Sequence, residues 1–185
     1  LLFVVAQLKD GHLFDAFRGR LDVERIAVIG HSFGGAASIE AALLDPSLRA
    51  VSNIDGTVYG ATHGRALDRP FLLLESDPKV TGHGERYLSG AEALISGAGG
   101  PAWRYAIEGA DHFVFTDAGM FFTPLGRWAL GRVTGGTRSA DEAHAASLDL
   151  LDAFLRKAFG MPGPGVEAAA AKHEGVRGAP SKPPA

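Results

Sequence analysis

The sequence predicts an α/β fold built on a mostly parallel sheet with flanking helices. Short apolar runs typical of buried strands alternate with segments of helical periodicity. One of these runs, Ile26–Ile29, passes through glycines directly into a helical segment. The chain of 185 residues is 46% hydrophobic and 21% charged, which is ordinary for a single globular domain with one core.

The N-terminal segment is predicted to be a helix. Leu1, Val5 and Leu8 recur at helical spacing and share one face. The chain starts inside this apolar segment, at a residue other than methionine, with no capping residue or charged leader in front of it. We therefore expect a fragment of a longer protein, one that lacks the first strands of the sheet.

The next elements are a strand at 26–29 and a helix that follows it closely. Four consecutive apolar residues suit a strand that is buried on both faces. The chain breaks at Gly30, and a helix is predicted from Gly34 to about Leu44, where Asp45 and a proline end it.

The remaining elements continue the alternation of strand and helix. Strands are predicted at 50–55, 70–76 and 102–107, and helices at 85–96 and 139–159. Ser139 and Glu142 form a capping box at the start of the last helix, and Gly160 ends it. Because helices connect the strands, we expect right-handed crossovers and parallel pairing.

The domain is predicted to span residues 1–160. Beyond it, proline, glycine, alanine and scattered charges replace large apolar side chains. Such a composition buries too little apolar surface to offset the entropy lost on ordering. We therefore expect residues 161–185 to form a disordered tail.

Composition and charge exclude several function classes. The net charge of −3 comes from interspersed acidic and basic residues, which argues against a nucleic-acid surface. The chain has no cysteine, and its histidines lack the spacing of a metal site, so neither a metal nor a thiol nucleophile is expected. No apolar run is long enough to span a bilayer. The sequence leaves the compartment open between cytoplasmic and secreted.

Residues 30–36, Gly-His-Ser-Phe-Gly-Gly-Ala, place Ser32 at the apex of the strand-to-helix turn. The short pattern Gly-x-Ser-x-Gly gains its weight from the strand before it and the helix after it. A turn this tight strains the serine backbone and points the hydroxyl clear of the sheet. Gly34 and Gly35 are expected to let helix and strand run close together. The alternative, a phosphate-binding loop, lacks the required Lys-Ser/Thr pair.

A histidine is the first partner that a serine nucleophile needs, because an imidazole must take the hydroxyl proton. In the usual chain order of nucleophile, acid and histidine, the histidine follows the last strand. His112 stands in that position. Of the other histidines, His12 precedes the serine, and His31 belongs to the turn and points elsewhere. His63 and His83 lie in loops before the final strand, and His144 sits on the last helix.

The acid that would orient His112 has two candidates, Asp55 and Asp77. Each ends a predicted strand, from which its carboxylate can reach the histidine. Asp77 comes from the strand farther from the serine, which is the commoner place for the acid. The candidate that is not used would initiate a loop, the usual role of aspartate before glycine or proline.

Three segments together resemble a known family: 30–36, Asn-Ile-Asp-Gly at 53–56, and His-Phe-Val-Phe-Thr-Asp at 112–117. They are similar to the platelet-activating factor acetylhydrolase family of α/β-hydrolases, from about residue 1 to 160. In that family the acid lies 23 residues after the serine, and Asp55 stands at that distance from Ser32. The resemblance thus implies Asp55, while Asp77 matches the arrangement of a general bacterial-type esterase or polyesterase.

The resemblance implies a serine esterase that hydrolyses a short-acyl ester, such as the sn-2 chain of a phospholipid. Ser32 would attack the carbonyl, His112 would take its proton, Asp55 would orient His112, and the Phe33 amide would meet the oxyanion. The second oxyanion donor is expected from an earlier loop outside this chain, and no cofactor is needed. Acyl transfer to another acceptor uses the same residues, and a non-catalytic binding protein of the same fold is the competing hypothesis.

The segment from Phe113 to Trp128 is dense in large apolar side chains. Aromatic residues beside a core strand usually belong to the core, so we expect this segment to cover the open end of the sheet. The alternatives are an acyl pocket and a surface that rests on lipid.

Overall fold

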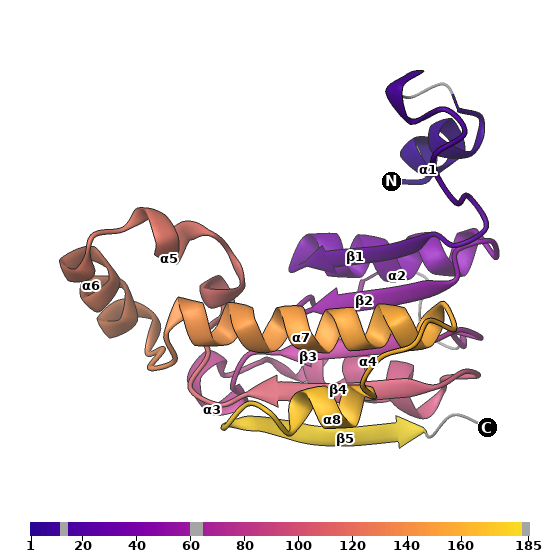
Figure 1. Cartoon of the computed structure of the whole chain (residues 1–185). Helices are drawn as coiled ribbons and strands as arrows, with labels where there is room; N and C mark the ends of the chain where they lie inside the picture. The colour runs from indigo at the N-terminus through magenta and orange to yellow at the C-terminus, as the bar shows by residue number, and fades with distance from the viewer. Residues whose placement is uncertain (12–14, 60–64, 183–185) are drawn as a thin grey trace.

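The computed structural model describes residues 1–11, 15–59 and 65–182 of the chain. These residues form a five-stranded sheet in the order β1-β2-β3-β4-β5 (Figure 1). The strands are β1 (Ala27–His31), β2 (Ala50–Ile54), β3 (Phe71–Glu75), β4 (Ala102–Ile107) and β5 (Val176–Lys182). The first four run parallel, and β5 pairs antiparallel with β4. The predicted α/β fold with a mostly parallel sheet is confirmed.

Helices cover both faces of the sheet (Figure 1). One face carries α2 (Phe33–Leu44) and α4 (Glu85–Ser96), and the other carries α7 (Ala140–Ala158) and α8 (Val166–Ala170). The remaining helices are α1 (Leu2–Lys9), α3 (Pro78–Thr81), α5 (Ala118–Phe121), α6 (Pro124–Thr134) and the 3₁₀ helices η1 (Asp15–Phe17) and η2 (His112–Phe115). The Ser139 hydroxyl accepts the Glu142 amide at 3.2 Å and so caps α7 as predicted.

Two apolar cores lie between the sheet and its two helix layers. The β3 strand contributes to both, because its side chains alternate in direction. Leu73 packs with Leu94 of α4 in one core, whereas Leu72 and Leu74 pack with Phe154 of α7 in the other. This burial on both faces is the reason that the strand reads as a continuous apolar run in the sequence.

The prediction of a disordered tail at 161–185 is wrong for the part that the structure describes. Val166 of α8 lies in the second core, and Trp103 Nε1 donates a hydrogen bond to Glu167 at 2.9 Å. The β5 strand uses the backbone donors and acceptors at the free edge of β4. Main-chain pairing therefore orders a segment that has few large apolar side chains. Residues 183–185 lie outside the described residues.

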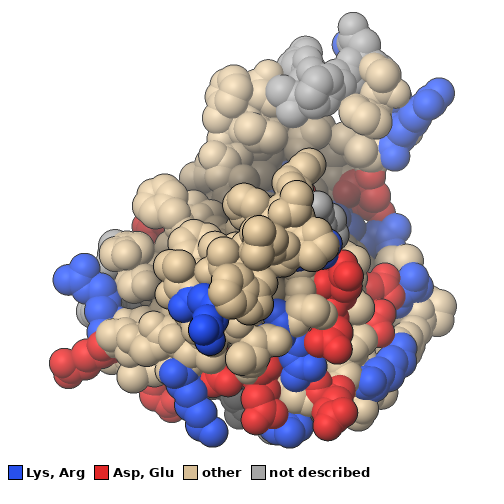
Figure 2. Space-filling view, turned by 90° about the vertical axis from the view of Figure 1, so that its left-hand side faces the viewer, with Lys and Arg blue, Asp and Glu red and all other residues tan. Residues whose placement is uncertain are grey.

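The carboxyl ends of β1 to β4 meet at one edge of the sheet, beyond which η2, α5 and α6 project (Figure 1). The prediction that the apolar segment 113–128 covers this end is wrong for α5 and α6, since Phe121 is 85% exposed and Trp128 61% exposed, whereas Val114 and Phe115 of η2 pack against the second core. None of the residues of α6 is buried. Figure 2 shows this end of the molecule as a broad surface of uncharged residues.

Candidate active site

Ser32 lies in the sharp turn between β1 and α2. Its φ of 57° and ψ of −125° are unusual for a residue with a side chain. The Ser32 amide donates to the Ile54 carbonyl at 2.8 Å, which continues the pairing of β1 with β2 up to the turn. Strain of this kind persists where neighbouring structure over-determines it, and costs about 1–3 kcal/mol.

Glycines allow α2 to start directly against the end of the sheet. A Cβ atom on Gly30 would overlap the backbone of Gly34, and one on Gly35 would overlap the Asn53 side chain and the Gly30 carbonyl. A Cβ on Gly34 would meet open space. The close approach therefore requires Gly30 and Gly35, and the prediction that Gly34 is needed for it is wrong.

Asp55 follows β2 in a second tight turn, where its φ is 53°. Asn53 brackets this turn with two hydrogen bonds: its Nδ2 donates to the Gly56 carbonyl at 2.8 Å, and its Oδ1 accepts the Gly56 amide at 2.9 Å. A Cβ on Gly56 would overlap the Ser32 carbonyl, so the two turns pack against each other. The backbone thus brings the serine and the aspartate to the same edge of the sheet.

His112 stands between these two side chains. Its Nδ1 lies 2.7 Å from Oδ2 of Asp55, and its Nε2 lies 3.0 Å from Oγ of Ser32. Because a carboxylate only accepts hydrogen bonds, Nδ1 carries the hydrogen, and Nε2 of the neutral ring is free to accept the serine hydroxyl. The geometry is that of a nucleophile, a general base and an orienting acid.

The electrostatics of the three groups support each other. The hydrogen bond to Asp55 raises the pKa of His112, and burial only partly opposes this shift. Burial alone would raise the pKa of Asp55, but hydrogen bonds from His112, His83 and Ser76 together hold it well below its usual range. Asp55 is therefore an anion at neutral pH, and its charge favours the protonated form of His112.

His83 is a neighbour of this site that sequence reasoning missed. The sequence places it in a loop before the final strand, and no motif marks it. In the structure its Nε2 lies 3.0 Å from the second carboxylate oxygen of Asp55, Oδ1. Ser76 donates to the same oxygen from both its amide and its hydroxyl, each at 2.9 Å.

His31 also differs from its prediction, because it does not point elsewhere. Its Nε2–H donates to the main-chain carbonyl of His112 at 3.0 Å, and the two rings lie 4.6 Å apart. Burial, followed by the charge of His112, lowers the pKa of His31. The neutral His31 ring therefore fixes the backbone of the histidine that faces the serine, a contact that its place within the 30–36 motif could have suggested.

Asp77, the alternative acid, is used elsewhere. Its Oδ1 accepts the Lys79 amide at 2.9 Å and caps α3, and its Oδ2 accepts the Gly109 amide at 2.8 Å. Burial raises the pKa of Asp77, but these backbone donors outweigh that effect and lower it. Asp77 thus ties α3 to the turn after β4, while the carboxylate that contacts His112 belongs to Asp55.

The remaining predicted residues are placed as follows. Phe33 is the first residue of α2, where backbone amides have no partner within the helix, and its side chain is exposed. His144 lies on α7. His12 and His63 lie outside the described residues. Within the described ranges, no cluster of side chains suits a metal ion, and no helix is both long and apolar enough to cross a bilayer.

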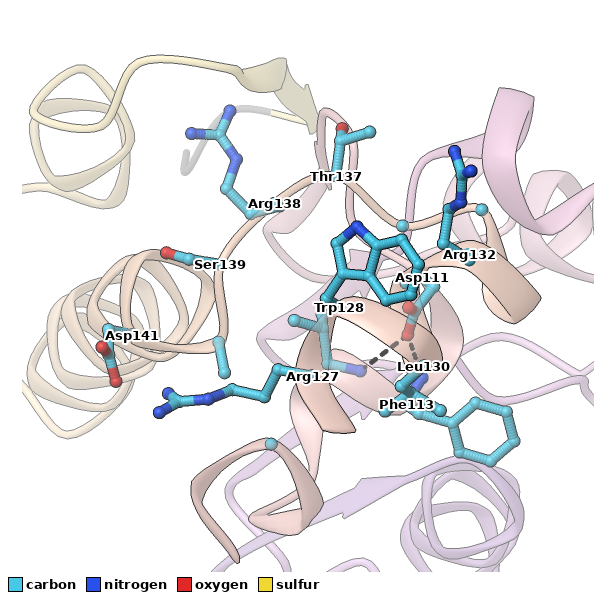
Figure 3. A pocket seen from close by; sticks show the side chains of 16 residues that line it. Asp111, Phe113, Arg127, Trp128, Leu130, Arg132, Thr137, Arg138, Ser139 and Asp141 are labelled. Atoms are coloured by element: carbon cyan, nitrogen blue, oxygen red, sulfur yellow. Dashed lines mark hydrogen bonds between the residues drawn. The ribbon is translucent and has the colours of Figure 1, made fainter. Parts of the chain in front are cut away.

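Two cavities flank the site without including Ser32, His112 or Asp55. One, of about 440 Å³, lies between η2, α6 and the start of α7, where Phe113, Arg127 and Trp128 contribute to its walls (Figure 3). The other, of about 510 Å³, is mostly apolar and lies between α1 and α2 beside Phe33 and Tyr59. A mostly apolar recess therefore adjoins the residue after the serine, and a recess of mixed polarity adjoins the helix that carries the histidine.

A comparison with solved structures finds an esterase of similar fold. A ferulic acid esterase from Streptomyces cinnamoneus superposes with a TM-score of 0.71 at 27% sequence identity, over 85% of this chain and 47% of the esterase. The chain thus spans about half the length of that esterase. No curated protein sequence matches the chain.

The family comparison covers most of the chain. The model of the family "Platelet-activating factor acetylhydrolase, isoform II" matches residues 4–160, which include all of β1 to β4 and the serine, aspartate and histidine described above. The match agrees with the resemblance found in the three sequence segments, and the chain belongs to the platelet-activating factor acetylhydrolase isoform II family.

Proposed function

We propose that this chain carries the catalytic centre of a serine esterase, with Ser32 as nucleophile, His112 as general base and Asp55 as the orienting acid. The observation that supports this most is the continuous line from Ser32 Oγ to His112 Nε2 at 3.0 Å and from His112 Nδ1 to Asp55 Oδ2 at 2.7 Å. Membership of the acetylhydrolase family and similarity to an esterase fold support the same reaction class.

Acylation begins when Ser32 Oγ attacks the ester carbonyl. His112 Nε2 takes the hydroxyl proton as the new C–O bond forms, and Asp55 stabilises the resulting imidazolium. His112 then gives that proton to the leaving alkoxide, the ester C–O bond breaks, and the alcohol departs. The product of this half-reaction is an acyl group bonded to Ser32.

Deacylation repeats the sequence with water. His112 removes a proton from water, the hydroxide attacks the acyl carbonyl, and the same proton returns to Ser32 Oγ as the acid leaves. In both halves the carbonyl oxygen becomes negative. The Phe33 amide at the start of α2 is the donor we assign to this oxygen, aided by the positive end of the helix dipole.

The substrate we propose is a short-acyl lipid or phospholipid ester. The exposed rings of Phe33 and Phe113 flank the serine and histidine along the chain, and Leu125 and Trp128 extend the apolar surface beyond them. Such a surface suits a ligand with hydrocarbon next to the ester, or a lipid interface that presents it. The proposed partner is thus a small-molecule or lipid ester, and no contact with nucleic acid is proposed.

The Asp77 version of the site, a general carboxylesterase or polyesterase, has less support. Asp77 would have to give up the Lys79 and Gly109 amides before it could turn to His112. Two buried or half-buried amides would then lose their acceptor, at a cost of about 1–3 kcal/mol each.

Covalent labelling tests the proposal directly. A fluorophosphonate probe should react with Ser32 of the full chain, and peptide mass spectrometry should locate the adduct there. Ser32→Ala should remain unlabelled, and wild type but not Ser32→Ala should hydrolyse p-nitrophenyl acetate and butyrate. A folded wild-type chain that is labelled no more than Ser32→Ala would contradict the esterase proposal and favour a non-catalytic protein of the same fold.

A further inference from the structure

Asp55 is held by two histidines, one on each carboxylate oxygen. His112 binds Oδ2 at 2.7 Å, and His83 binds Oδ1 at 3.0 Å. The side chain of Asp55 is fully buried and that of His83 is 8% exposed, so solvent does not screen the second contact. His112 acts as the base in the proposed reaction, and His83 has no part in its proton transfers.

The His83 ring has a fixed orientation. It lies flat on the Tyr87 ring of α4, with ring centroids 3.7 Å apart and ring planes 8° from parallel. Gly82 ends α3 in the left-handed conformation, with φ of 59°, and so turns the chain toward the sheet edge just before His83. A ring held by stacking presents its Nε2 to Asp55 in one rotamer, which is what a positioning group requires.

His83 contacts Asp55 through one ring nitrogen, Nε2. Nε2 lies 3.0 Å from Asp55 Oδ1 and 3.3 Å from the Ser76 hydroxyl, and it carries the hydrogen because the carboxylate is an acceptor only. Nδ1 of His83 is buried, and no hydrogen-bond partner lies near it among the described residues. The contact therefore draws charge density from Asp55.

We propose, on the basis of the proposed esterase function, that His83 is a positioning residue whose Nε2–H holds Asp55 Oδ1 and draws part of the carboxylate charge away from His112. A carboxylate that shares its charge with more donors attracts the His112 proton less strongly. The pKa of His112 is then lower than it would be if fewer donors held Asp55. His112 therefore stays deprotonated, and able to accept the Ser32 proton, down to a lower pH.

Other titratable or charged groups face this cluster from the elements packed around it. They are His31 from β1, Glu75 at the end of β3, Tyr87 of α4, Arg104 of β4 and Asp111 before η2. Burial raises the pKa of Tyr87, so its hydroxyl stays neutral, and Glu75 and Arg104 pair with each other at 2.6 Å. All five stay in place in the variants used below, so they contribute equally to each measurement.

The test distinguishes the effect of the His83 N–H donor from the effect of the His83 ring. His83→Phe keeps a flat ring against Tyr87 and removes the N–H, whereas His83→Gln keeps an N–H donor. His144→Phe, on α7, is the matched control for a histidine-to-phenylalanine change. Two quantities are measured on the full chain: the acidic midpoint of kcat/KM for p-nitrophenyl acetate, and the His112 titration midpoint from imidazole NMR signals.

We expect His83→Phe to raise both midpoints by about half a pH unit or more, because Asp55 then acts on His112 with more of its charge. His83→Gln, which keeps a donor, should hold both midpoints close to their wild-type values, and His144→Phe should leave both unchanged. His83→Leu removes the same donor and replaces His83→Phe if that variant does not fold.

An unchanged or lowered His112 midpoint in a folded His83→Phe or His83→Leu chain would overturn the proposal, as would a His83→Gln chain that shifts as much as His83→Phe. The NMR titration needs no turnover. A chain that shows the expected NMR shifts but hydrolyses no ester supports the role of His83 and contradicts the esterase proposal instead.

Discussion

The Asp55 carboxylate is the residue on which the proposed site depends most. It is buried at the end of β2, yet both of its oxygens receive hydrogen bonds, from His112 on one side and from Ser76 and His83 on the other. A buried carboxylate is stable as an anion only with such partners. The same partners that keep Asp55 charged therefore also set its action on His112.

The pH dependence of activity follows from the shift of His112. Asp55 raises the pKa of His112 above the ordinary 6.5. The base becomes protonated as pH falls, so kcat/KM should decrease with a midpoint above pH 6.5. Asp55→Asn removes the negative charge and should move this midpoint to lower pH. Asp77→Asn should leave it in place. A wild-type midpoint below 6.5, measured from a pH–kcat/KM profile, would contradict this assignment.

The pKa shifts of Asp55 and His112 determine how the stability of the fold changes with pH. The contribution of Asp55, whose pKa is depressed, is present above the unfolded value of about 3.9 and is lost as pH falls below it. The contribution of His112, whose pKa is raised, is present below about 6.5 and is lost as pH rises through the folded value. Urea unfolding at pH 5 and pH 8 should therefore show a larger loss of stability for Asp55→Asn at pH 5. An equal loss at both pH values would contradict the coupling.

The glycines of the serine turn allow a matched comparison. Gly35→Ala should destabilise the fold by about 1–3 kcal/mol or more, because the new methyl overlaps Asn53 and the Gly30 carbonyl. Gly34→Ala, one residue away in the same helix, meets open space and should be neutral or stabilising by up to about 1 kcal/mol. Chemical denaturation of both variants measures the difference. Equal destabilisation of the two variants would contradict the assignment of the close contact to Gly35 and not to Gly34.

At the residue scale, the site residues that lie in short sequence motifs were predictable. The turn around Ser32 and the two short segments around Asp55 and His112 are local patterns, and the structure brings these three side chains together at hydrogen-bond distance. His83 has no such pattern. Its contact with Asp55 arises because α3, Gly82 and the stack on Tyr87 return a loop to the sheet edge, which is a tertiary effect.

At the element scale, the strands and long helices of the parallel part were predictable because their apolar periodicity is strong. The β5 strand was not, since its residues Val176–Lys182 lack the alternation of a half-buried strand and include a proline. What orders it is the backbone edge of β4, together with α8, whose Val166 and Ala169 enter the second core. A strand that is ordered mainly by pairing with another strand cannot be recognised from its own residues.

The contribution of α8 can be measured by comparing two valines. Val166→Ala should lower the free energy of unfolding by about 1–3 kcal/mol, since Val166 is buried in the second core. Val133→Ala, at an 85% exposed position of α6, should change it by less than about 0.5 kcal/mol. Denaturant titrations of both variants give the two values. A negligible effect at Val166 would contradict the packing of α8 on the sheet.

At the scale of the whole molecule, the described structure exposes apolar side chains at the end that bears the proposed site. The α6 helix has no buried residue, and α5 and α6 stand away from the sheet in Figure 1. The segment from Ala118 to Arg138 contains three arginines and no acidic residue. Apolar side chains flanked by arginines are typical of helices that lie in a lipid interface.

Tryptophan fluorescence tests contact of this end with lipid. Trp103 is buried, whereas Trp128 of α6 is exposed, so Trp103→Phe leaves a single reporter on the apolar surface. Addition of vesicles that contain phosphatidylglycerol should shift its emission to the blue, and Leu125→Ser with Phe121→Ser should weaken the effect. Emission that does not change with any vesicle would contradict a lipid-facing role for α6.

The central claim, that Ser32, His112 and Asp55 act as one catalytic unit, is tested most directly by kcat/KM for p-nitrophenyl acetate in Asp55→Asn and Asp77→Asn. We expect Asp55→Asn to lose about 10³- to 10⁴-fold, as loss of the orienting acid does in serine proteases. Asp77→Asn, which removes only a loop contact, should stay within about tenfold of wild type. A folded Asp77→Asn chain with the larger loss, or a Ser32→Ala chain as active as wild type, would contradict the account.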